Sequence, residues 1–320
     1  MTEQEKSALA SALVELRKEL KAYRNRHWLR NLLIIGVLVL MVFNVMGRGM
    51  YNPTQEQVAI IDVQGVIADD QLANSADIIR GLKQASDNPQ VVAIVLNINS
   101  PGGSPVQSAQ VYRAIKALKK ERGNLPIYAV IQDIGASGAY FIAAATDDIY
   151  ADPASLVGSI GVISQQFGYQ QLLEKLGLDS RTFTAGEHKN FLSGAKPLNE
   201  KEVAHMQTLL DTIHQQFIDA VKQGRGERLA DNPEIFSGLF WTGEQAKALG
   251  LIDGFASPSE LKQQRFPNAE WVDYSPAGHP LEQALRNMGM EMGSGVGQGA
   301  LKTLNSALGL EQQVHPVLSK

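Results

Sequence analysis

The sequence contains no cysteine, and this absence narrows the chemistry open to the protein. Disulfides, thiolate nucleophiles and cysteine-ligated metals are excluded. Histidine is also scarce, and the six histidines show no metal-ligand spacing such as His-Glu-x-x-His, so no metal site is expected. Positive charge is not in excess either. The formal net charge is −4, which predicts no general attraction for nucleic acid.

One long apolar run lies near the N-terminus. Residues 32–46 carry no charge and are interrupted only by Asn44, in a chain of 320 residues that is otherwise ordinary in composition. The run is shorter than the roughly 20 residues of most membrane-spanning helices, and a secretory signal is the main alternative. Because a long polar segment precedes the run and no clear cleavage site follows it, we expect an uncleaved transmembrane anchor over residues 31–47.

The charges around this run predict its orientation. Only Arg48 follows it closely, whereas seven basic residues precede it: Lys6, Arg17, Lys18, Lys21, Arg24, Arg26 and Arg30. The positive-inside rule places residues 1–30, an expected helix, in the cytoplasm. We therefore expect a single-pass protein of the bacterial inner membrane, in contact with its lipid. A periplasmic domain would cover residues 55–274, and a loose glycine-rich tail residues 275–320.

The region after the anchor alternates short apolar strands with helices. This order predicts an α/β fold with a parallel sheet covered by helices. Two helices begin with sequences typical of a capping box, Ser104 with Gln107 and Thr242 with Gln245. The expected strands lie at 57–70, 91–99, 126–133, 147–152, 156–164 and 179–185, and the clearest helices at 104–122, 169–177 and 199–224.

Two glycine-bearing turns follow expected strands, at residues 100–104 and 135–138. Ligands bind outside the carboxyl ends of parallel strands, and glycine lets a backbone approach closely and expose its N–H groups. Ser137 sits in the second turn at the start of an expected helix, whose dipole favours an alkoxide. Close backbone packing explains such a turn equally well. A phosphate site is not favoured, because no P-loop lysine and no Gly-x-Gly-x-x-Gly motif follow a strand.

A nucleophilic serine needs a base, and the sequence offers several. His188 is one. Lys189 is another, since the apolar Phe191 and Leu192 follow it and burial lowers the pKa of a lysine toward the range of a useful base. Lys196 is the nearby alternative. The residues alone leave these three open.

Four segments carry a resemblance to a known family. They are "LNINSPGGS" (96–104), "DIGASGAYFIAAATDDIYADPASLVGSIGVI" (133–163), "TAGEHKNFLSGAKPL" (184–198) and "FSGLFWTGEQAKALGLIDG" (236–254). In combination they make the chain, over about residues 57–260, resemble signal peptide peptidase A of the short, single-domain bacterial type. The resemblance implies the repeated ββα superhelical fold of the ClpP protease and crotonase. It also implies a serine endopeptidase that degrades hydrophobic peptides such as remnant signal peptides, with no metal and no cofactor.

The resemblance also implies roles for individual residues. Ser137 would be the nucleophile, Lys189 the general base and Ser159 the residue that orients the lysine. The oxyanion would be bound by backbone N–H groups of Gly138 and of Gly102 or Gly103, and an extended substrate would pair with an exposed strand edge at Gly158, Ile160, Gly161 and Val162. Subunits would form a homo-oligomeric ring in which the working serine and lysine come from adjacent subunits.

Two classes of relative, and one non-enzymatic role, are alternatives. A protease of the SohB or stomatin-operon type would cleave segments of membrane proteins. A crotonase-type enzyme would act on acyl-CoA in the cytoplasm, but the turn "SPGGSP" lacks the catalytic glutamate that such an enzyme would carry. A membrane scaffold without catalysis is the third alternative, and a serine-directed covalent probe would distinguish it from a peptidase.

Overall fold

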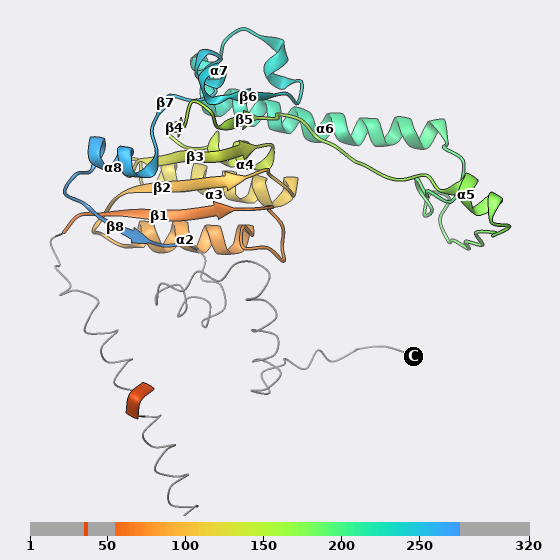
Figure 1. Cartoon of the computed structure of the whole chain (residues 1–320), viewed down its shortest axis with the longest axis horizontal. Coiled ribbons are helices and arrows are strands. Elements are labelled where there is room, and N and C mark those ends of the chain that lie inside the picture. Colours follow the sequence, from red (N-terminus) through yellow and green to blue (C-terminus); the bar gives the residue numbers. More distant parts are fainter. Residues whose placement is uncertain (1–34, 38–54, 276–320) are drawn as a thin grey trace, which may run out of the picture. The chain divides into compact units, whose positions relative to one another are not determined.

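The structure is a computed structural model that describes residues 35–37 and 55–275 (Figure 1). The expected cytoplasmic helix, nearly all of the expected anchor and the glycine-rich tail lie outside the described residues. Within the described residues, no helix has the length and apolar character needed to cross a membrane.

The centre of the domain is a mixed sheet of eight strands. Three long parallel strands form its middle: β1 (Gln57–Gln64), β2 (Val91–Ser100) and β3 (Ile127–Ala136). The shorter strands extend it: β8 (Glu270–Asp273) beside β1, β4 (Asp148–Ala151) and β5 (Leu156–Gly158) beside β3, β6 (Phe240–Thr242) beside β5, and β7 (Gly254–Phe255) beside β4. All neighbours are parallel except β5 and β6. The predicted α/β fold with a mainly parallel sheet is confirmed.

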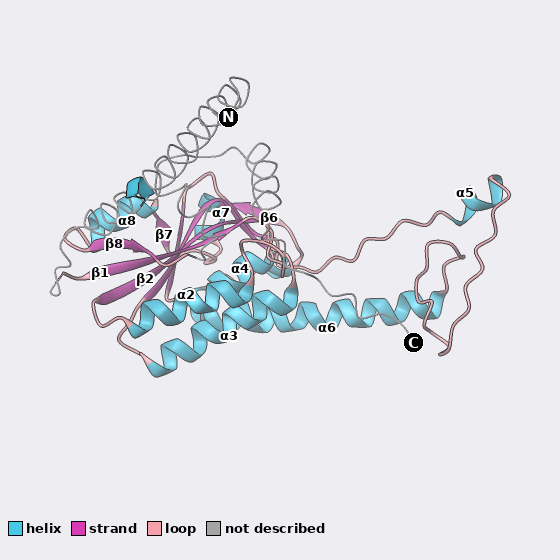
Figure 2. Cartoon of the chain, turned by 90° about the horizontal axis from the view of Figure 1, so that it is seen from below, coloured by secondary structure: helices cyan, strands magenta, loops and turns pink. Residues whose placement is uncertain are grey.

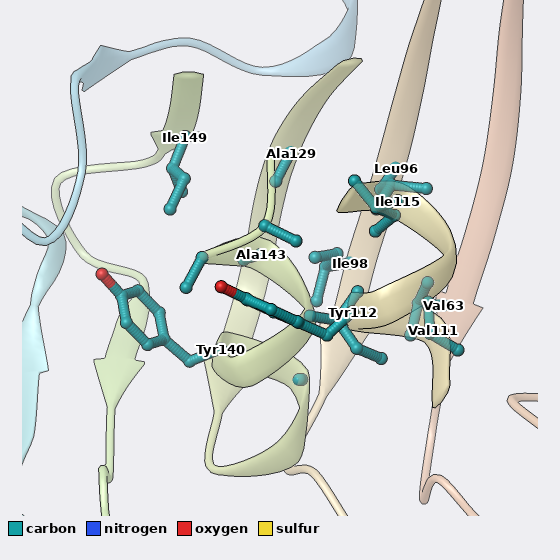
Figure 3. Close-up of a cluster of buried hydrophobic side chains, with 14 of the residues drawn as sticks. Val63, Leu96, Ile98, Val111, Tyr112, Ile115, Ala129, Tyr140, Ala143 and Ile149 are labelled. Atoms are coloured by element: carbon teal, nitrogen blue, oxygen red, sulfur yellow. The ribbon is translucent and has the colours of Figure 1, made fainter. Parts of the chain in front are cut away.

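Apolar residues alternate to both faces of the middle strands, which explains their nearly continuous hydrophobic sequences. Helices α2 (Ser75–Asp87), α3 (Pro105–Glu121) and α4 (Gly138–Ala143) cover one face. There Leu96 and Ile98 of β2 meet Val111 and Tyr112 of α3 in the main core (Figure 3). A smaller cluster on the other face includes Leu261 of α8 (Pro258–Arg265). Both faces of the sheet therefore carry buried apolar residues.

One segment leaves this body and returns. Residues 159–199, here called the arm, follow β5, contain α5 (Gln170–Lys175) and lead into the long helix α6 (Glu200–Arg225). Both views show α5 beyond the far end of α6, away from the sheet (Figures 1 and 2). Only the second half of α6 carries core residues. Large apolar side chains of the arm are exposed: Ile163, Phe167, Leu172, Leu176, Leu178, Phe183 and Leu198.

Three predicted strands were wrong in extent or existence. The strand expected at 57–70 ends at Gln64, before the turn at Gly65. The strand expected at 156–164 ends at Gly158, where the chain enters the arm, and residues 179–185 form no strand. Their β-branched and aromatic residues favour extended backbone, but the part of the chain that the structure describes places no strand beside them. Strand propensity without a partner therefore misled the prediction.

The capping predictions had different outcomes. The box of Thr242 and Gln245 is confirmed at the start of α7 (Gly243–Ala248). At α3, the hydroxyl of Ser104 accepts the N–H of Gln107 as expected, 3.4 Å away. The prediction of the reciprocal bond, from the Ser104 N–H to the Gln107 side chain, was wrong, because that side chain instead accepts the N–H of Ser75 at 2.7 Å. That contact ties the start of α3 to the start of α2.

Candidate active site

Ser137 occupies a strained turn between β3 and α4. Its φ angle is 51°, in the left-handed region that residues other than glycine rarely adopt. Two backbone hydrogen bonds maintain this conformation. The N–H of Ser137 donates to the carbonyl of Gly158 at 2.8 Å, and its own carbonyl accepts the N–H of Phe141 at 2.9 Å. Strain of this kind persists only where the surroundings enforce it, and it is concentrated at functional sites.

The turn after β2 lies directly against Ser137. Gly102 has φ +96°, and a Cβ placed on it would lie 2.8 Å from Cβ of Ser137 and 2.6 Å from the nitrogen of Gly138. Only glycine satisfies both the angle and the space. The two glycine turns therefore meet, as their positions after adjacent parallel strands predict.

Hydrogen bonding distinguishes the possible oxyanion donors. The N–H of Gly102 already donates to Oγ of Ser100, 3.1 Å away. The carbonyl of Gly102 accepts the N–H of Ile67 at 2.9 Å. In the trans peptide that joins Gly102 to Gly103, the N–H of Gly103 points opposite to this carbonyl. The N–H of Gly103 therefore points away from Ile67. The nitrogen of Gly103 lies 3.3 Å from where a Cβ of Gly138 would be.

The N–H groups of Gly103 and Gly138 donate no hydrogen bond to any group within residues 55–275. Two neighbouring donors without partners, beside a strained serine, form the arrangement that binds an oxyanion. Of the two predicted alternatives, this geometry favours Gly103 over Gly102.

Ser159 lies next to the contact that holds the nucleophile turn. It follows Gly158, whose carbonyl accepts the N–H of Ser137, and it also has a positive φ, 50°. Its N–H donates to the carbonyl of Leu239 at 2.8 Å. The structure therefore brings Ser137 and Ser159 into one neighbourhood.

The exposed strand edge is shorter than expected. Gly158 lies between Ala136 of β3 and Phe240 of β6, so both of its edges are occupied. Ile160 is buried, and its carbonyl is 3.0 Å from Nε2 of His214 on α6. Within the described residues, the backbone of Gly161 and Val162 has no strand partner. An extended peptide would find unpaired backbone from Gly161 onward, and binding by Gly158, Ile160, Gly161 and Val162 stays a prediction.

The candidate bases lie in the arm. The side chain of Lys189 is exposed, and the backbone N–H of Lys189 donates to the carbonyl of Gly186. The ring of Phe191 contacts His205 of α6, with centroids 5.7 Å apart, instead of walling the lysine. His188 is also exposed. These side chains therefore belong to a loop packed on the first half of α6.

Glu202 anchors that loop. Its carboxylate accepts the N–H of Leu192 at 2.8 Å and pairs with Nζ of Lys196 at 2.7 Å. The hydrogen bond from Lys196, followed by the one from Leu192, holds the pKa of Glu202 below its usual range. Nζ of Lys196 is therefore engaged with a carboxylate of its own chain.

A single chain does not join the serine and the lysine. Helix α4, which follows Ser137, contacts α6 through Phe141 and Phe217, whose ring centroids are 4.9 Å apart. The Lys189 loop is anchored at Glu202 instead, and the rise of an α-helix puts positions 202 and 217 about 22 Å apart along the axis. The contacts that anchor Ser137 and Lys189 therefore lie far apart along α6 of one chain.

The sequence did not single out two residues of this region. Ser100 accepts the N–H of Gly102 within the first glycine turn. Its position at the end of a strand, directly before Pro-Gly-Gly, could have indicated this contact. His214 contacts the backbone after Ser159, but nothing in its local sequence indicated this. Within the described residues, no cluster of histidine and acidic side chains is placed to hold a metal ion.

Comparison with known proteins adds a family to this geometry. Residues 119–265 match Peptidase family S49. The chain is 30% identical over 234 residues to the "Putative signal peptide peptidase SppA" of Enterococcus faecium, covering 69% of this chain and 67% of that protein. The chain belongs to peptidase family S49. The S49 match includes Ser137, Ser159 and Lys189, whereas the turn of Gly102 and Gly103 precedes it.

Other relatives of the S49 region belong to longer proteins. The chain is 42% identical over 224 residues to the Na(+)/H(+) antiporter NhaA of Brucella melitensis, which covers 70% of this chain but only 30% of that protein. It is 28% identical over 214 residues to Protease 4 of Haemophilus influenzae, which covers 66% of this chain and 34% of that protein. The chain thus spans about a third of each of these two relatives.

Proposed function

We propose that this S49 protein is a membrane-anchored serine endopeptidase that uses a dyad of Ser137 and Lys189. The observation that carries the proposal is the strained Ser137 turn, with the free N–H groups of Gly103 and Gly138 beside it. Family membership supports the same reaction. No cofactor takes part in it.

The proposed reaction has two steps. Neutral Lys189 takes the proton of the Ser137 hydroxyl while Oγ bonds to the substrate carbonyl carbon. The resulting oxyanion accepts hydrogen bonds from the N–H groups of Gly103 and Gly138. The C–N bond then breaks as the lysine ammonium protonates the leaving amine. The same lysine then takes a proton from water, whose oxygen bonds to the acyl carbon. The ester C–O bond breaks as the lysine ammonium returns that proton to Oγ of Ser137, and the acid product leaves. Ser159 would orient the lysine amine.

The lysine would come from a neighbouring subunit of a homo-oligomeric ring. The anchoring of the Lys189 loop far along α6 from Phe217 supports this arrangement. The exposed apolar side chains of the arm, among them Phe183 and Leu198, support it as well, because exposed apolar surface is stabilised by burial against another chain. Catalysis would then depend on assembly.

The proposed substrates are hydrophobic peptides such as signal peptides released from preproteins. The name of the Enterococcus faecium relative supports this class. We further propose that residues 31–47 anchor the protein in the bacterial inner membrane, with residues 1–30 cytoplasmic and the catalytic domain periplasmic. The mixed sheet and its helices would belong to the ClpP and crotonase type of repeated ββα fold.

Cleavage of segments within membrane proteins, as by SohB or stomatin-operon proteases, is the nearest alternative. Free signal peptides and an intact membrane-protein substrate, compared on one preparation, would distinguish the two. An acyl-CoA enzyme of the crotonase type is the weaker alternative.

A fluorophosphonate probe followed by peptide mapping tests the nucleophile. We expect label on Ser137 and none after Ser137→Ala. Peptide cleavage should be lost in both Ser137→Ala and Lys189→Ala. Label on another residue, or full cleavage by either variant, would reject the dyad.

Mixing the two inactive variants tests the ring. When Ser137→Ala and Lys189→Ala chains assemble together, some sites contain an intact serine from one subunit and an intact lysine from the next. We expect cleavage to return in co-assembled protein but not in either variant alone. Absence of recovery in a verified mixed oligomer would place both groups on the same chain.

A further inference from the structure

Ser100 is a buried hydroxyl that the proposed reaction does not use. It is the last residue of β2 and has no exposed surface. Its Oγ lies 3.1 Å from the nitrogen of Gly102, and the two atoms form a buried hydrogen bond. Removing the hydroxyl would leave the N–H of Gly102 buried without a partner.

We propose that Ser100 is a positioning residue that sets the oxyanion hole, an inference that rests on the proposed function. Two contacts control the orientation of the peptides on either side of Gly102. The backbone N–H of Ile67 donates to the carbonyl of Gly102, and the hydroxyl oxygen of Ser100 accepts the N–H of Gly102. Together they direct the next N–H, that of Gly103, toward Gly138.

These two contacts are needed because glycine does little to limit rotation of the peptide planes on either side of it. Gly102 at φ +96° and Gly103 at φ +154° have no side chains to limit rotation of their peptide planes. Rotation of the plane between Pro101 and Gly102 would change where the following N–H points. An oxyanion donor contributes only if it is oriented before charge develops on the substrate.

The role predicts a specific kinetic pattern. The oxyanion exists in the transition state and not in the bound substrate, so loss of Ser100 should lower kcat and leave KM unchanged. Losing a whole oxyanion donor costs about 100- to 1,000-fold in kcat, and a donor that is only misoriented costs less. We expect a loss of about ten- to a hundredfold for Ser100→Ala.

The experiment compares three variants of the full chain in its assembled state. Ser100→Ala removes the hydroxyl, Ser100→Thr retains one, and Ser86→Ala is the matched control. Ser86 is also a buried serine, 5% exposed, but its hydroxyl donates to the carbonyl of Lys83 on α2. Thermal unfolding and oligomer size confirm that each variant is folded and assembled.

Three measurements follow. Peptide hydrolysis gives kcat and KM, a peptide boronate reports affinity for a transition-state analogue, and uncleaved peptide binding is measured in a Ser137→Ala background. For Ser100→Ala we expect kcat and boronate affinity to fall by a similar factor, with peptide binding unchanged. Ser100→Thr should recover part of the loss, and Ser86→Ala should match the parent.

Amide hydrogen exchange supplies a readout independent of activity. The N–H of Gly102 should exchange faster in Ser100→Ala than in the parent, while that of Phe141 should not change. A rise in KM at constant kcat, or kinetics equal to those of Ser86→Ala, would overturn the role of Ser100. A parent protein that neither cleaves peptides nor reacts at Ser137 would overturn the proposed function itself, and the positioning role with it.

Discussion

Nε2 of His214 lies 3.0 Å from the carbonyl oxygen of Ile160, and this contact joins two segments 54 residues apart in sequence. It connects α6 to the point where the chain leaves β5 and enters the arm. A ring nitrogen can contact a carbonyl in this way only as an N–H donor. His214 therefore steadies the backbone between Ser159 and the free stretch that begins at Gly161.

We expect His214→Ala to raise KM for peptides by about two- to tenfold, the equivalent of one hydrogen bond. The effect on kcat should be smaller, because Ser137 and its oxyanion donors are held by other contacts. His214→Gln, which keeps an N–H donor, should recover part of the loss. Gln215→Ala is the control, since Gln215 is exposed and its side chain donates to Asp219 of its own helix. Unchanged KM in His214→Ala would exclude this role.

Gly102 and Gly65 offer a matched test of the oxyanion turn. Both have positive φ, +96° and +76°, but a Cβ on Gly65 meets nothing within 4 Å, whereas a Cβ on Gly102 meets Ser137 and Gly138. Alanine at either position should cost about 1–2 kcal/mol through the backbone angle. Only Gly102→Ala should also abolish peptide cleavage. Urea unfolding and hydrolysis of a fluorogenic peptide measure the two effects. Equal activity in the two variants would contradict the proposed site.

Glu202 should make the Lys189 loop sensitive to acid. The pKa of Glu202 is held below its usual range by the hydrogen bonds from Lys196 and Leu192, so the anchor is complete above the unfolded pKa, about 4.3. It should be lost as the pH falls through the lower folded value. Exchange of the Leu192 N–H against pH should show this release, and Glu202→Gln should weaken the anchor at neutral pH. Glu200→Gln, an exposed neighbour, is the control. A Leu192 exchange rate that is the same in both variants would refute the anchor.

Arg225, at the end of α6, and Asp253 form a buried ion pair. The guanidinium is 2% exposed and donates two hydrogen bonds to the carboxylate, of 2.7 and 2.9 Å. Arg225→Met removes the buried partner of a largely buried carboxylate, which keeps only the more exposed Arg228 at 3.1 Å, and should destabilise the fold by about 3 kcal/mol. The double variant with Asp253→Asn should lose less. Arg80→Met, which breaks an exposed pair with Asp77, should cost at most about 1 kcal/mol. Chemical denaturation checks all three.

The same pair predicts a pH dependence of stability. Burial raises the pKa of Asp253, but the hydrogen bonds from Arg225 and from the N–H of Ile149, with the charges of Arg225 and Arg228, outweigh burial and lower it. A depressed folded pKa contributes stability above the unfolded value, about 3.9, and that stability disappears as the pH falls through the folded value. Arg225→Met should therefore flatten the acid limb of a plot of unfolding free energy against pH. An unchanged acid limb would contradict this assignment.

Much of the fold could be predicted because its elements carry local patterns. The β-branched runs of β1, β2 and β3, the glycine turns after them and the cap at Thr242 are each readable within a few residues. Their alternation with helices also determined that the strands run parallel and that the turns after β2 and β3 lie at one end of the sheet. Ser137 could be found in the same way, since a small turn at a strand-to-helix junction is a local feature.

Only the tertiary structure decided how these parts combine. The strand expected at 179–185 has the composition for a sheet but no neighbour, and pairing depends on distant chain. The choice of Gly103 over Gly102 rests on the hydrogen bond that Gly102 donates to Ser100 and the one it accepts from Ile67, which no spacing rule encodes. The separation of Ser137 from Lys189 follows from where each is anchored along α6. Local sequence specifies conformation and chemistry, whereas contacts between remote segments decide which groups meet, because those contacts depend on the packing of the whole chain.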